Sequence, residues 1–474
     1  MRAGPCSVLL CALALSACAL SDPPPREEIA KLGAPNLTPP AKWSAEGGAT
    51  GAVADDWLAS WNVPALDAMV AEALAYNSDL RLAAARVDVA AGYLQAAGSP
   101  LWPQVNLVAR GGGKMGGDAS GLQGVGLFAS WELDVWGRVR AEKAATEMQY
   151  HAARLDAEYA RQSVAALVAK GWLLAIEARL AKGRSEEMQR SAEQLASLTR
   201  DRLRVGVGDE YDVAVAQANV NSYRDTVRSL ELAYENALRA LESLVGRYPA
   251  AAIAVADALP NWPGEIPMGL PSELLERRPD LVAAERRVAA AFYRTDEAKA
   301  ARLPRFSLVA NVTTLSSEMF VLQNRDNPVF SVGAGLVQPI FLGGYLQSQV
   351  DIRTAEQQAA IVDYGKISAR VFGEVENALS AGFAATEREE ILAQSLRDNA
   401  RALELAKVRY RVGSGDLRAV QQQQLALYSV QVALLRVQTE RLIQRVNLHL
   451  ALGGSFEAPS TTPTKTSDAT RVSP

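Results

Sequence analysis

The side chains that most often carry covalent or metal chemistry are few in this chain of 474 residues. All three cysteines, Cys6, Cys11 and Cys18, lie near the N-terminus, so the rest of the chain can form neither disulfides nor thiolate metal sites. His151 and His449 are the only histidines, which argues against a histidine-based metal centre or catalytic triad. We therefore expect no metal and no cofactor. Of these side chains, only the N-terminal cysteines remain as candidates for covalent chemistry.

Cys18 lies in a context that suits one specific reaction. Arg2, the apolar run VLLCALAL and the sequence LSAC at 15–18 together resemble a bacterial secretory leader that ends in a lipobox, where the cysteine sulfur is lipidated. The apolar run is too short to span a membrane as a helix. Ala19 stands where an aspartate would retain a lipoprotein in the inner membrane. We expect Cys18 to be lipidated at the outer membrane; an ordinary leader cleaved near Ala17 is the alternative.

The composition favours long packed helices and excludes one class of partner. Hydrophobic residues make up 49% of the chain and aromatic residues only 6%, with abundant alanine. The formal net charge is −4, so the chain has no basic field that would attract nucleic acid. No phosphate-binding loop is present, because the motifs GVGD and GSGD are poor in glycine and do not follow a strand.

The chain contains an internal duplication. The sequence RVGVGD at 204–209 recurs as RVGSGD at 411–416, an offset of 207 residues (413 − 206) that also relates Gly246 to Gly453. This period is too long for a solenoid repeat, so it indicates two copies of one domain. The predicted division is 1–17 signal peptide, 18–64 lipid-anchored extended tether, 65–260 first repeat, 261–453 second repeat and 454–474 disordered tail.

Each predicted repeat has the same order of elements. A helical segment (65–98 or 271–301) comes first, a pair of strands (103–135 or 304–340) follows, and a long helical hairpin (138–246 or 344–453) ends the repeat. Proline is absent between Pro103 and Pro249, as long helices require. The first long helix, 138–204, would extend about 100 Å at ~1.5 Å per residue, so another helix must cover it.

The returning helices carry a coiled-coil pattern. Apolar residues recur at spacings of three and four through the first copy, at Val213, Ala216, Val220, Tyr223, Val227, Leu230, Tyr234, Ala237, Leu241 and Leu244. The matching positions of the second copy include the polar Gln423, Arg441 and Gln444. These polar positions indicate either a looser helix pair or a face turned toward water.

The two glycine-rich breaks are expected to be hairpin ends. Glycine permits the left-handed backbone that ends one helix, and we assign this role to both glycines of each break. Asp209 and Asp416 follow the breaks and can cap the returning helices.

The strand pairs alternate apolar with small or polar residues over about ten positions, which is typical of membrane strands. In RFSLVANVT, for example, Phe306, Leu308, Ala310 and Val312 share one face. Four strands per chain cannot close a barrel in lipid. Several chains must therefore share one barrel, and three chains would supply twelve strands, so the strands and long helices predict a membrane protein of the α+β class. A small soluble β-domain is the alternative.

Four motifs in order resemble the outer-membrane efflux factor family, the trimeric TolC/NodT-type channels of tripartite export pumps, in its lipoprotein branch. They are SWELDVWGRVRAEKAA at 130–145, ERRPDLVAAERRVAAA at 276–291, QPIFLGGYLQSQVDIRTAEQQAA at 338–360 and YRVGSGDLRAVQQQQ at 410–424. The resemblance covers about 60 to 453. It implies a homotrimer whose shared twelve-stranded outer-membrane β-barrel, with four strands per chain, is continued by a long α-helical coiled-coil barrel in the periplasm and a mixed equatorial domain. It also implies a periplasmic adaptor and an inner-membrane pump as partners.

The resemblance also assigns functions to the hairpin ends. It implies that the adaptor docks on Arg204, Val205, Gly206, Val207 and Gly208 and on Arg411, Val412, Gly413, Ser414 and Gly415. A gate is expected beside the second end, with Asp416 and Arg418 as candidates. Gly415 stands where family members often have an acidic residue, so Asp416 is a candidate for a simple helix cap as well.

The leading interpretation is a passive exit duct for small molecules such as drugs, toxic compounds or metal ions. A structural coiled-coil lipoprotein that links outer membrane and cell wall would explain Cys18 and the heptads but not the strand pairs. The exit duct of a type I protein secretion system is a further alternative. A periplasmic hydrolase would need a nucleophile and a base. Carboxylates such as Glu132 and Asp134 could be proposed, but the family resemblance implies that WELDVWG ends a strand of the barrel.

Overall fold

The computed structural model describes residues 22–45, 51, 53, 55–110, 123–264, 266–267, 269, 271, 277–316 and 329–457. The chain divides into two compact units. Unit 1 comprises Met1–Thr38, Ala83–Ala157 and Asp280–Ala369, and unit 2 comprises Pro39–Leu82, Glu158–Pro279 and Arg370–Pro474. The predicted signal peptide and Cys18 lie outside the described residues.

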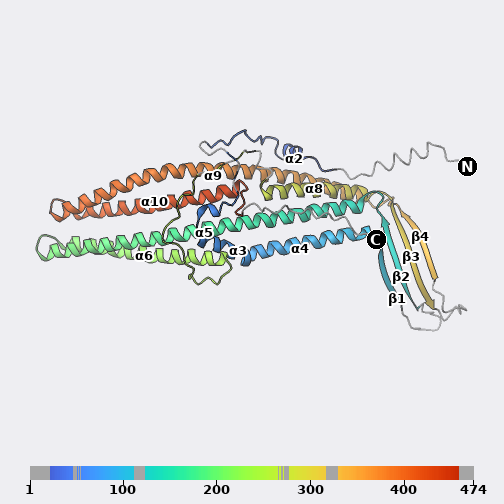
Figure 1. Cartoon of the computed structure of the whole chain (residues 1–474), viewed down its shortest axis with the longest axis horizontal. Helices are drawn as coiled ribbons and strands as arrows, with labels where there is room; N and C mark the ends of the chain where they lie inside the picture. The colour runs from blue at the N-terminus through green and yellow to red at the C-terminus, as the bar shows by residue number, and fades with distance from the viewer. Residues whose placement is uncertain are drawn as a thin grey trace. The chain divides into compact units, whose positions relative to one another are not determined.

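Unit 1 combines helices with a four-stranded sheet (Figure 1). Its helices are α2 (Arg26–Gly33), α8 (Pro279–Ala300), most of α4 (Ser78–Gly98) and the first parts of α5 (Arg138–Arg204) and α9 (Tyr345–Arg411). Its strands are β1 (Gln104–Arg110), β2 (Gln123–Leu133), β3 (Arg305–Ser316) and β4 (Val329–Val337), and a short 3₁₀ turn, η3 (Ser99–Leu101), precedes β1.

The sheet is antiparallel, with the strands in chain order β1-β2-β3-β4. Its register aligns Leu107 with Leu127, Leu127 with Val312, and Val312 with Phe330. Because side chains alternate along each strand, these partners share a face that is apolar across all four strands. The opposite face is mixed: it holds Asn106, Gly126, Asn311 and Ser331 but also Phe128. The alternation predicted from the sequence is therefore present in the sheet.

Unit 2 holds the two helical hairpins. The first pairs α5 with α6 (Glu210–Leu244), and the second pairs α9 with α10 (Leu417–Ala451). The helix α3 (Pro64–Tyr76) and a 3₁₀ turn, η2 (Ala59–Trp61), complete the unit. The hairpin helices begin and end within two residues of the bounds predicted from proline, glycine and heptad spacing. Among the described residues, no helix is both long and apolar enough to cross a membrane.

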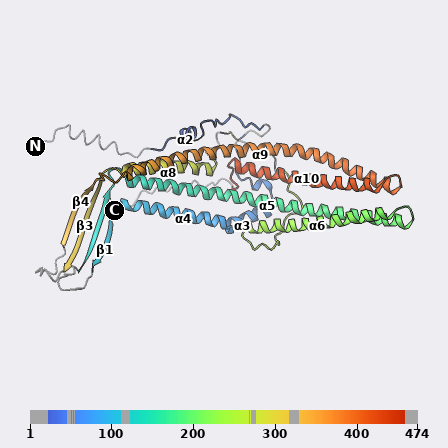
Figure 2. The ribbon, with the colours of Figure 1, turned by 180° about the vertical axis from the view of Figure 1, so that it is seen from behind.

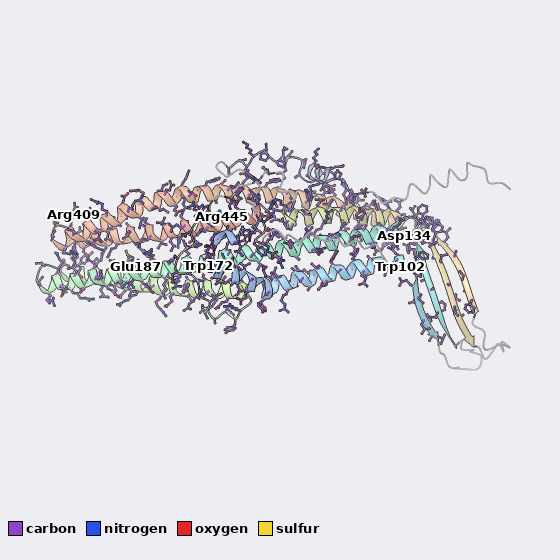
Figure 3. The ribbon with its side chains drawn as sticks, viewed as in Figure 1. Trp102, Asp134, Trp172, Glu187, Arg409 and Arg445 are labelled. Carbon is purple, nitrogen blue, oxygen red and sulfur yellow. The ribbon has the colours of Figure 1, made fainter. Side chains whose placement is uncertain are left out.

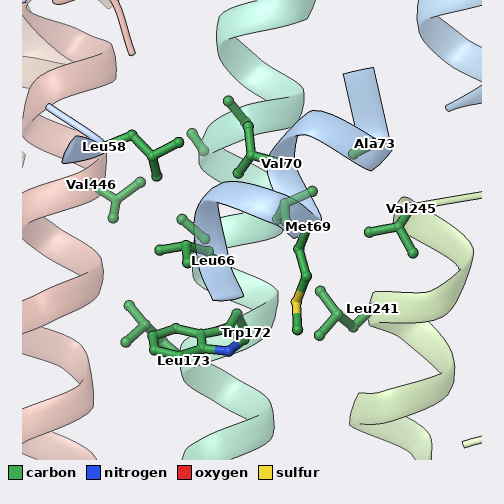
Figure 4. Close-up of a cluster of buried hydrophobic side chains, with 14 of the residues drawn as sticks. Leu58, Leu66, Met69, Val70, Ala73, Trp172, Leu173, Leu241, Val245 and Val446 are labelled. Atoms are coloured by element: carbon green, nitrogen blue, oxygen red, sulfur yellow. The ribbon is translucent and has the colours of Figure 1, made fainter. Parts of the chain in front are cut away.

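The main core of unit 2 lies where α3 meets the hairpins. Trp172 and Leu173 of α5, Met69 of α3, Leu241 of α6 and Val446 of α10 converge there, as Figure 4 shows. Burying large apolar side chains contributes about 1.5–3 kcal/mol each. Trp172, which is fully buried, is the largest side chain of this cluster.

The predicted helical segment 65–98 is two helices. Asn77 separates α3 from α4: its Oδ1 accepts the N–H groups of Asp79 and Leu80 at 2.9 and 3.2 Å. This is an N-cap, which satisfies donors that a new helix leaves unpaired. In the second copy, α8 begins at Pro279, later than the predicted 271.

The prediction of an extended tether over 18–64 is wrong for its described part. Ile29 of α2 is buried, and Gly33 packs so close to Gly365 of α9 that a Cβ on Gly365 would meet the Gly33 carbonyl oxygen at 2.2 Å. Farther on, Trp43 contacts Phe372, and the Glu376 carboxylate accepts the N–H groups of Ser44 and Ala45. The segment is thus packed against α9 rather than free.

The predicted disordered tail also begins too early. Phe456 is buried in the core of unit 2, and the Ser455 N–H donates to Asp55 at 2.9 Å. The chain is therefore packed through Glu457, and residues 458–474 lie outside the described part.

The polar seam positions of α10 are partly covered by protein. Arg441 pairs with Glu389 of α9 at 2.9 Å and lies 4.0 Å from the ring centroid of Trp262. Gln423 and Gln444 are half-buried. Both interpretations therefore stay open for Gln423 and Gln444, whereas Arg441 packs against Trp262 and pairs with α9.

Candidate docking and gating site at the hairpin ends

The two hairpin ends share one backbone conformation. Gly206 and Gly413 have φ of +79° and +80°. The residue after each glycine closes the helix with a backbone hydrogen bond to the carbonyl five residues earlier. The Val207 N–H donates to the Arg202 carbonyl at 2.9 Å, and the Ser414 N–H donates to the Arg409 carbonyl at 3.0 Å. This is the Schellman arrangement, in which a left-handed glycine ends a helix.

The second glycine of each end has a different function from the one predicted. Gly208 and Gly415 do not adopt a positive φ. A Cβ on Gly208 would lie 3.1 Å from the Arg202 Cβ, and one on Gly415 would lie 3.0 Å from the Arg409 Cβ. The assignment of left-handed backbone to both glycines is therefore half wrong: the first glycine supplies the conformation, and the second supplies space.

Asp209 and Asp416 are the N-caps of the returning helices. The carboxylate of Asp209 accepts the Asp212 N–H, and that of Asp416 accepts the Ala419 N–H, both at 2.7 Å. A cap of this kind contributes about 1 kcal/mol to helix stability. The cap function considered for Asp416 is thus present, and Arg418 beside it is exposed.

Large side chains at the hairpin ends point into solvent. Val205, Val207 and Val412 are 67%, 62% and 71% exposed. Arg204 is also exposed and pairs only locally, with Asp201 at 2.9 Å. Arg409, labelled in Figure 3, lies one turn before the second end. Exposed valines at two equivalent positions form an apolar surface that the chain itself does not cover.

A contact joins the two ends and was not expected from the sequence. Arg202 of α5 donates to the Tyr410 carbonyl of α9 at 2.9 Å, and its guanidinium lies 4.7 Å from the Tyr410 ring centroid. Below this contact, all four helices contribute to an apolar cluster of Met188, Ala192, Leu195, Ala196, Ala216, Val220, Tyr223, Leu403, Tyr410, Leu417 and Val420. Leu203 is the first-copy counterpart of Tyr410, so the duplication gave no signal for the pair.

Burial and, to a smaller extent, neighbouring carboxylates raise the pKa of Asp212 and of Tyr410 near this contact. Burial, followed by the charge of Asp209, raises the pKa of Asp212, and the carboxylate of Asp416 adds to the effect while Arg202 opposes it. Burial also raises the pKa of the Tyr410 hydroxyl. The two hairpin ends are therefore electrostatically coupled, with Arg202 as the cation between their acids.

The carboxylates considered for hydrolysis have structural partners in unit 1. Glu132 pairs with Arg138 at 3.1 Å, and Asp134, labelled in Figure 3, accepts the N–H groups of Val139 and Arg140 at the start of α5. Within the described part of the chain, no three His, Cys, Asp or Glu side chains are placed to hold a metal ion.

Comparison with known proteins identifies the chain's relatives. The family model for outer membrane efflux proteins matches residues 69–247 and 270–454, two segments that together cover most of the chain. The chain is an outer membrane efflux protein. The pyoverdine export outer membrane protein OpmQ of Pseudomonas putida is 31% identical over 470 residues, which cover 95% of this chain and 97% of OpmQ. The cation efflux system protein CusC of Escherichia coli K12 is 28% identical over 95% of this chain and 99% of CusC.

Solved structures of efflux channels share the fold of this outer membrane efflux protein. The outer-membrane channel OprN superposes with a TM-score of 0.80 at 25% identity, over 90% of this chain and 99% of OprN. The open-state MtrE channel of Neisseria gonorrhoeae gives 0.78 at 27% identity, over 90% and 98%. These matches confirm the predicted fold class, a trimeric channel with an internal duplication, and the outer-membrane location. The protein is thus the outer-membrane component of a tripartite efflux system.

Proposed function

We propose that the two hairpin ends form the periplasmic entrance of a passive exit duct and are the surface on which the adaptor docks. The observation that carries this proposal is the pair of equivalent, exposed valines, Val205 and Val412, beside left-handed glycines. No packing within the chain requires valine at either position. An apolar surface of this kind fits a protein partner, since apolar side chains rarely stay exposed in pairs without one.

Asp416 and Arg418 remain our proposed gate residues, and the contact of Arg202 with Tyr410 adds a candidate hinge point. Movement of the second hairpin away from the first would break this contact and separate Asp416 from Asp212. Asp416 raises the pKa of Asp212, so the two carboxylates repel each other, and their separation favours the open arrangement. Asp416→Ser keeps a capping oxygen but removes this repulsion, so lowered resting conductance in planar bilayers would support gating, and unchanged conductance would leave Asp416 a cap only.

Cys18 is proposed to carry the lipid that attaches the mature N-terminus to the outer membrane. The close packing of α2 against α9 supports this, because it fixes the chain a few residues after Cys18. One acyl group gives only marginal membrane affinity, so the strands would supply most of the anchoring. Mass spectrometry of the mature N-terminus tests the proposal, and an unmodified terminus at another residue would refute it.

The cargo is proposed to be a small molecule selected by the inner-membrane pump. Relatives of comparable identity are named for pyoverdine export, cation efflux and toluene efflux. These relatives are named for export and efflux rather than for a chemical reaction. We accordingly propose no enzymatic activity.

The docking proposal is tested by charging the exposed valines. Val412→Asp should abolish export and weaken crosslinking to the adaptor, while the amount of trimer stays normal, because Val412 has no internal contact to lose. Ile391→Asp on α9 is the matched control, since Ile391 is 67% exposed but distant in sequence from the end. Export that survives Val412→Asp and Val205→Asp together would refute docking at the ends.

A further inference from the structure

The second hairpin contains a buried arginine without an acidic partner. Arg445, labelled in Figure 3, lies on α10, which runs beside α9 in Figures 1 and 2. Its side chain is only 5% exposed, yet no carboxylate in the described part of the chain forms an ion pair with it. Burial alone lowers the pKa of its guanidinium to about 10. Because an ion loses its hydration on burial, a buried charge without a counter-ion is costly.

The contacts of Arg445 leave part of its guanidinium unpaired. One terminal N–H donates to the backbone carbonyl of Gly264, and the guanidinium carbon lies 5.3 Å from the ring centroid of Trp262. The Nε–H group is buried and has no hydrogen-bond partner among the described residues. A carbonyl and an aromatic ring offer partial negative charge but not a full one. Arg445 therefore keeps an excess of positive charge.

A second guanidinium lies beside the same ring. Arg441 precedes Arg445 by four residues, so both lie on one face of α10. Its guanidinium carbon is 4.0 Å from the Trp262 ring centroid, and it pairs with Glu389 of α9 at 2.9 Å. The Nε–H group of Arg441 is nonetheless buried and unpartnered within the part of the chain that the structure describes. The pair with Glu389 thus neutralises Arg441 and leaves Arg445 without a counter-ion.

His449 extends the same face of α10 by one further turn. Its side chain is 3% exposed, and its ring is stacked on Trp57. Neither ring nitrogen has a hydrogen-bond partner among the described residues. Burial, with the charge of Arg445 as a smaller cause, lowers the pKa of His449 to about 3. At neutral pH the imidazole is therefore uncharged and offers one N–H donor and one acceptor nitrogen.

We propose that Arg445, Arg441 and His449 bind a small inorganic anion of about the size of chloride on this face of α10. Their unpaired groups are mostly donors: two guanidinium Nε–H groups and one imidazole N–H, against one imidazole acceptor. Water donates as well as accepts, whereas an anion only accepts and also supplies the negative charge that Arg445 lacks. An anion therefore satisfies these groups better than water, and unsatisfied buried groups point to such an occupant.

Trp262 limits which anions can reach this site. The ring lies against both guanidiniums and is itself 39% exposed, so it separates them from solvent without sealing them off. It lies between the two segments that match the family model, next to Gly264, whose carbonyl already contacts Arg445. The unpaired nitrogen atoms are themselves buried, so only a small ion can lie against them. Chloride and bromide should therefore bind, and the larger gluconate ion should not.

Bromide gives a direct test, because it is close to chloride in size and is visible by anomalous X-ray scattering. We would crystallise the full-length trimer in sodium bromide and map the anomalous signal. The expected result is a peak within contact distance of the Arg445 Nε and of the His449 ring. A map without a bromide peak there, or one with water or an acidic side chain on the Arg445 Nε–H, would overturn the proposal. No substitution is needed, so folding of a variant cannot confuse the result.

Urea unfolding tests the same site in solution. An anion that binds only the folded state stabilises it, so we would measure the urea midpoint in chloride and in gluconate at one ionic strength. The midpoint in chloride minus that in gluconate should be more positive for the parent protein than for Arg445→Met. This variant keeps a long side chain but removes the charge and the Nε–H group. It should fold, because replacing an unpaired buried charge with an apolar side chain removes a desolvation cost.

The matched control is Arg388→Met on α9, where an exposed arginine pairs with Glu440. This variant should keep the anion dependence of the parent protein, because general effects of the two salts act on all three proteins alike. An equal difference between the salts in the parent protein and in Arg445→Met would overturn the proposal. Export and adaptor crosslinking are not measured here, so the result is independent of docking at the hairpin ends.

Discussion

The roots of the two hairpins, where α6 and α10 end, make equivalent contacts with different side chains. In the first copy, Asn77 donates to the Leu244 carbonyl at the end of α6, at 2.9 Å. In the second copy, Arg278 donates to the carbonyl of Ala451, the counterpart of Leu244, at 3.3 Å. Arg278 has no exposed surface, pairs with Glu374 at 2.6 Å and lies against the Tyr159 ring. A neutral cap in one copy has thus been replaced by a buried cation in the other.

A second pair of counterparts differs even more. Glu242 is buried in the first copy, and its carboxylate accepts the N–H groups of Ala251, Ala252 and Ile253. His449 occupies the same place in the second copy and is stacked on Trp57 at a centroid distance of 5.7 Å. Neither ring nitrogen of His449 has a hydrogen-bond partner among the described residues.

What the two roots keep in common is backbone geometry. Gly246 and Gly453 both have positive φ. A Cβ on Gly246 would lie about 3 Å from Tyr76, just before α4, and one on Gly453 would lie about 3 Å from Arg277, just before α8. Both copies therefore keep glycine where left-handed backbone and a close neighbour disfavour any side chain, while the side chains that fill space or form pairs differ.

Removing Arg278 should have the largest effect on stability. Arg278→Ala breaks a buried ion pair and three contacts, so we expect a loss of about 3 kcal/mol, seen as a lower urea midpoint of the detergent-solubilised trimer. Asn77→Ala is the matched variant and should lose about 1–2 kcal/mol, because its hydrogen bonds are neutral. Equal losses would show that the charge at the second root contributes nothing beyond the shared hydrogen bond.

Acidification should distinguish the roots next. Burial, with the charge of Arg445 as a smaller cause, lowers the pKa of His449 to about 3 from 6.5. The unfolded chain therefore binds this proton first, and stability should fall by up to about 1.4 kcal/mol per pH unit below about pH 6.5. His449→Phe keeps the stacking on Trp57 and should flatten this slope; a slope that persists would refute the assignment.

Glu242 should respond only at lower pH. Burial raises the pKa of its carboxyl, but the backbone N–H groups of Ala251, Ala252 and Ile253 lower it further, so the net pKa is below 4.5. Its contribution is present above about pH 4.5 and is lost as the pH falls through the folded value. Between pH 6.5 and 4.5, the urea midpoint of Glu242→Gln should depend on pH as steeply as that of the parent protein. This variant is therefore the control for His449→Phe.

The smallest predicted difference lies at the hairpin ends, where the copies are alike. Gly206→Ala and Gly413→Ala should each cost about 1–2 kcal/mol, because both place a Cβ on left-handed backbone with open space around it. The two losses should agree within error in the same urea titration. A clear inequality would mean that the partner hairpin supports one end more than the other.

Much of the architecture was predictable because it is locally encoded. The heptad spacing from Val213 to Leu244 marks the covered side of α6, and Asp209 and Asp416 cap the helices they precede. The α2 segment was not predictable, since its docking depends on Gly33 meeting Gly365, far away in sequence. At the candidate site, the glycines and valines were identified from the repeat, whereas Arg202 and Tyr410 were missed because the copies differ there.

By itself, the sequence determined the duplication, the bounds of the long helices, the two faces of the strands and the membership in the efflux family. Periodicity encodes these features because each depends on side chains that are neighbours along one helix or strand. Only the tertiary structure decided that Arg445, labelled in Figure 3, and His449 are buried on α10, and that Val89 of α4 and Ile352 of α9 stay exposed. An apolar stripe specifies that a face must be covered, but the element that covers it is set by packing between segments distant in the chain.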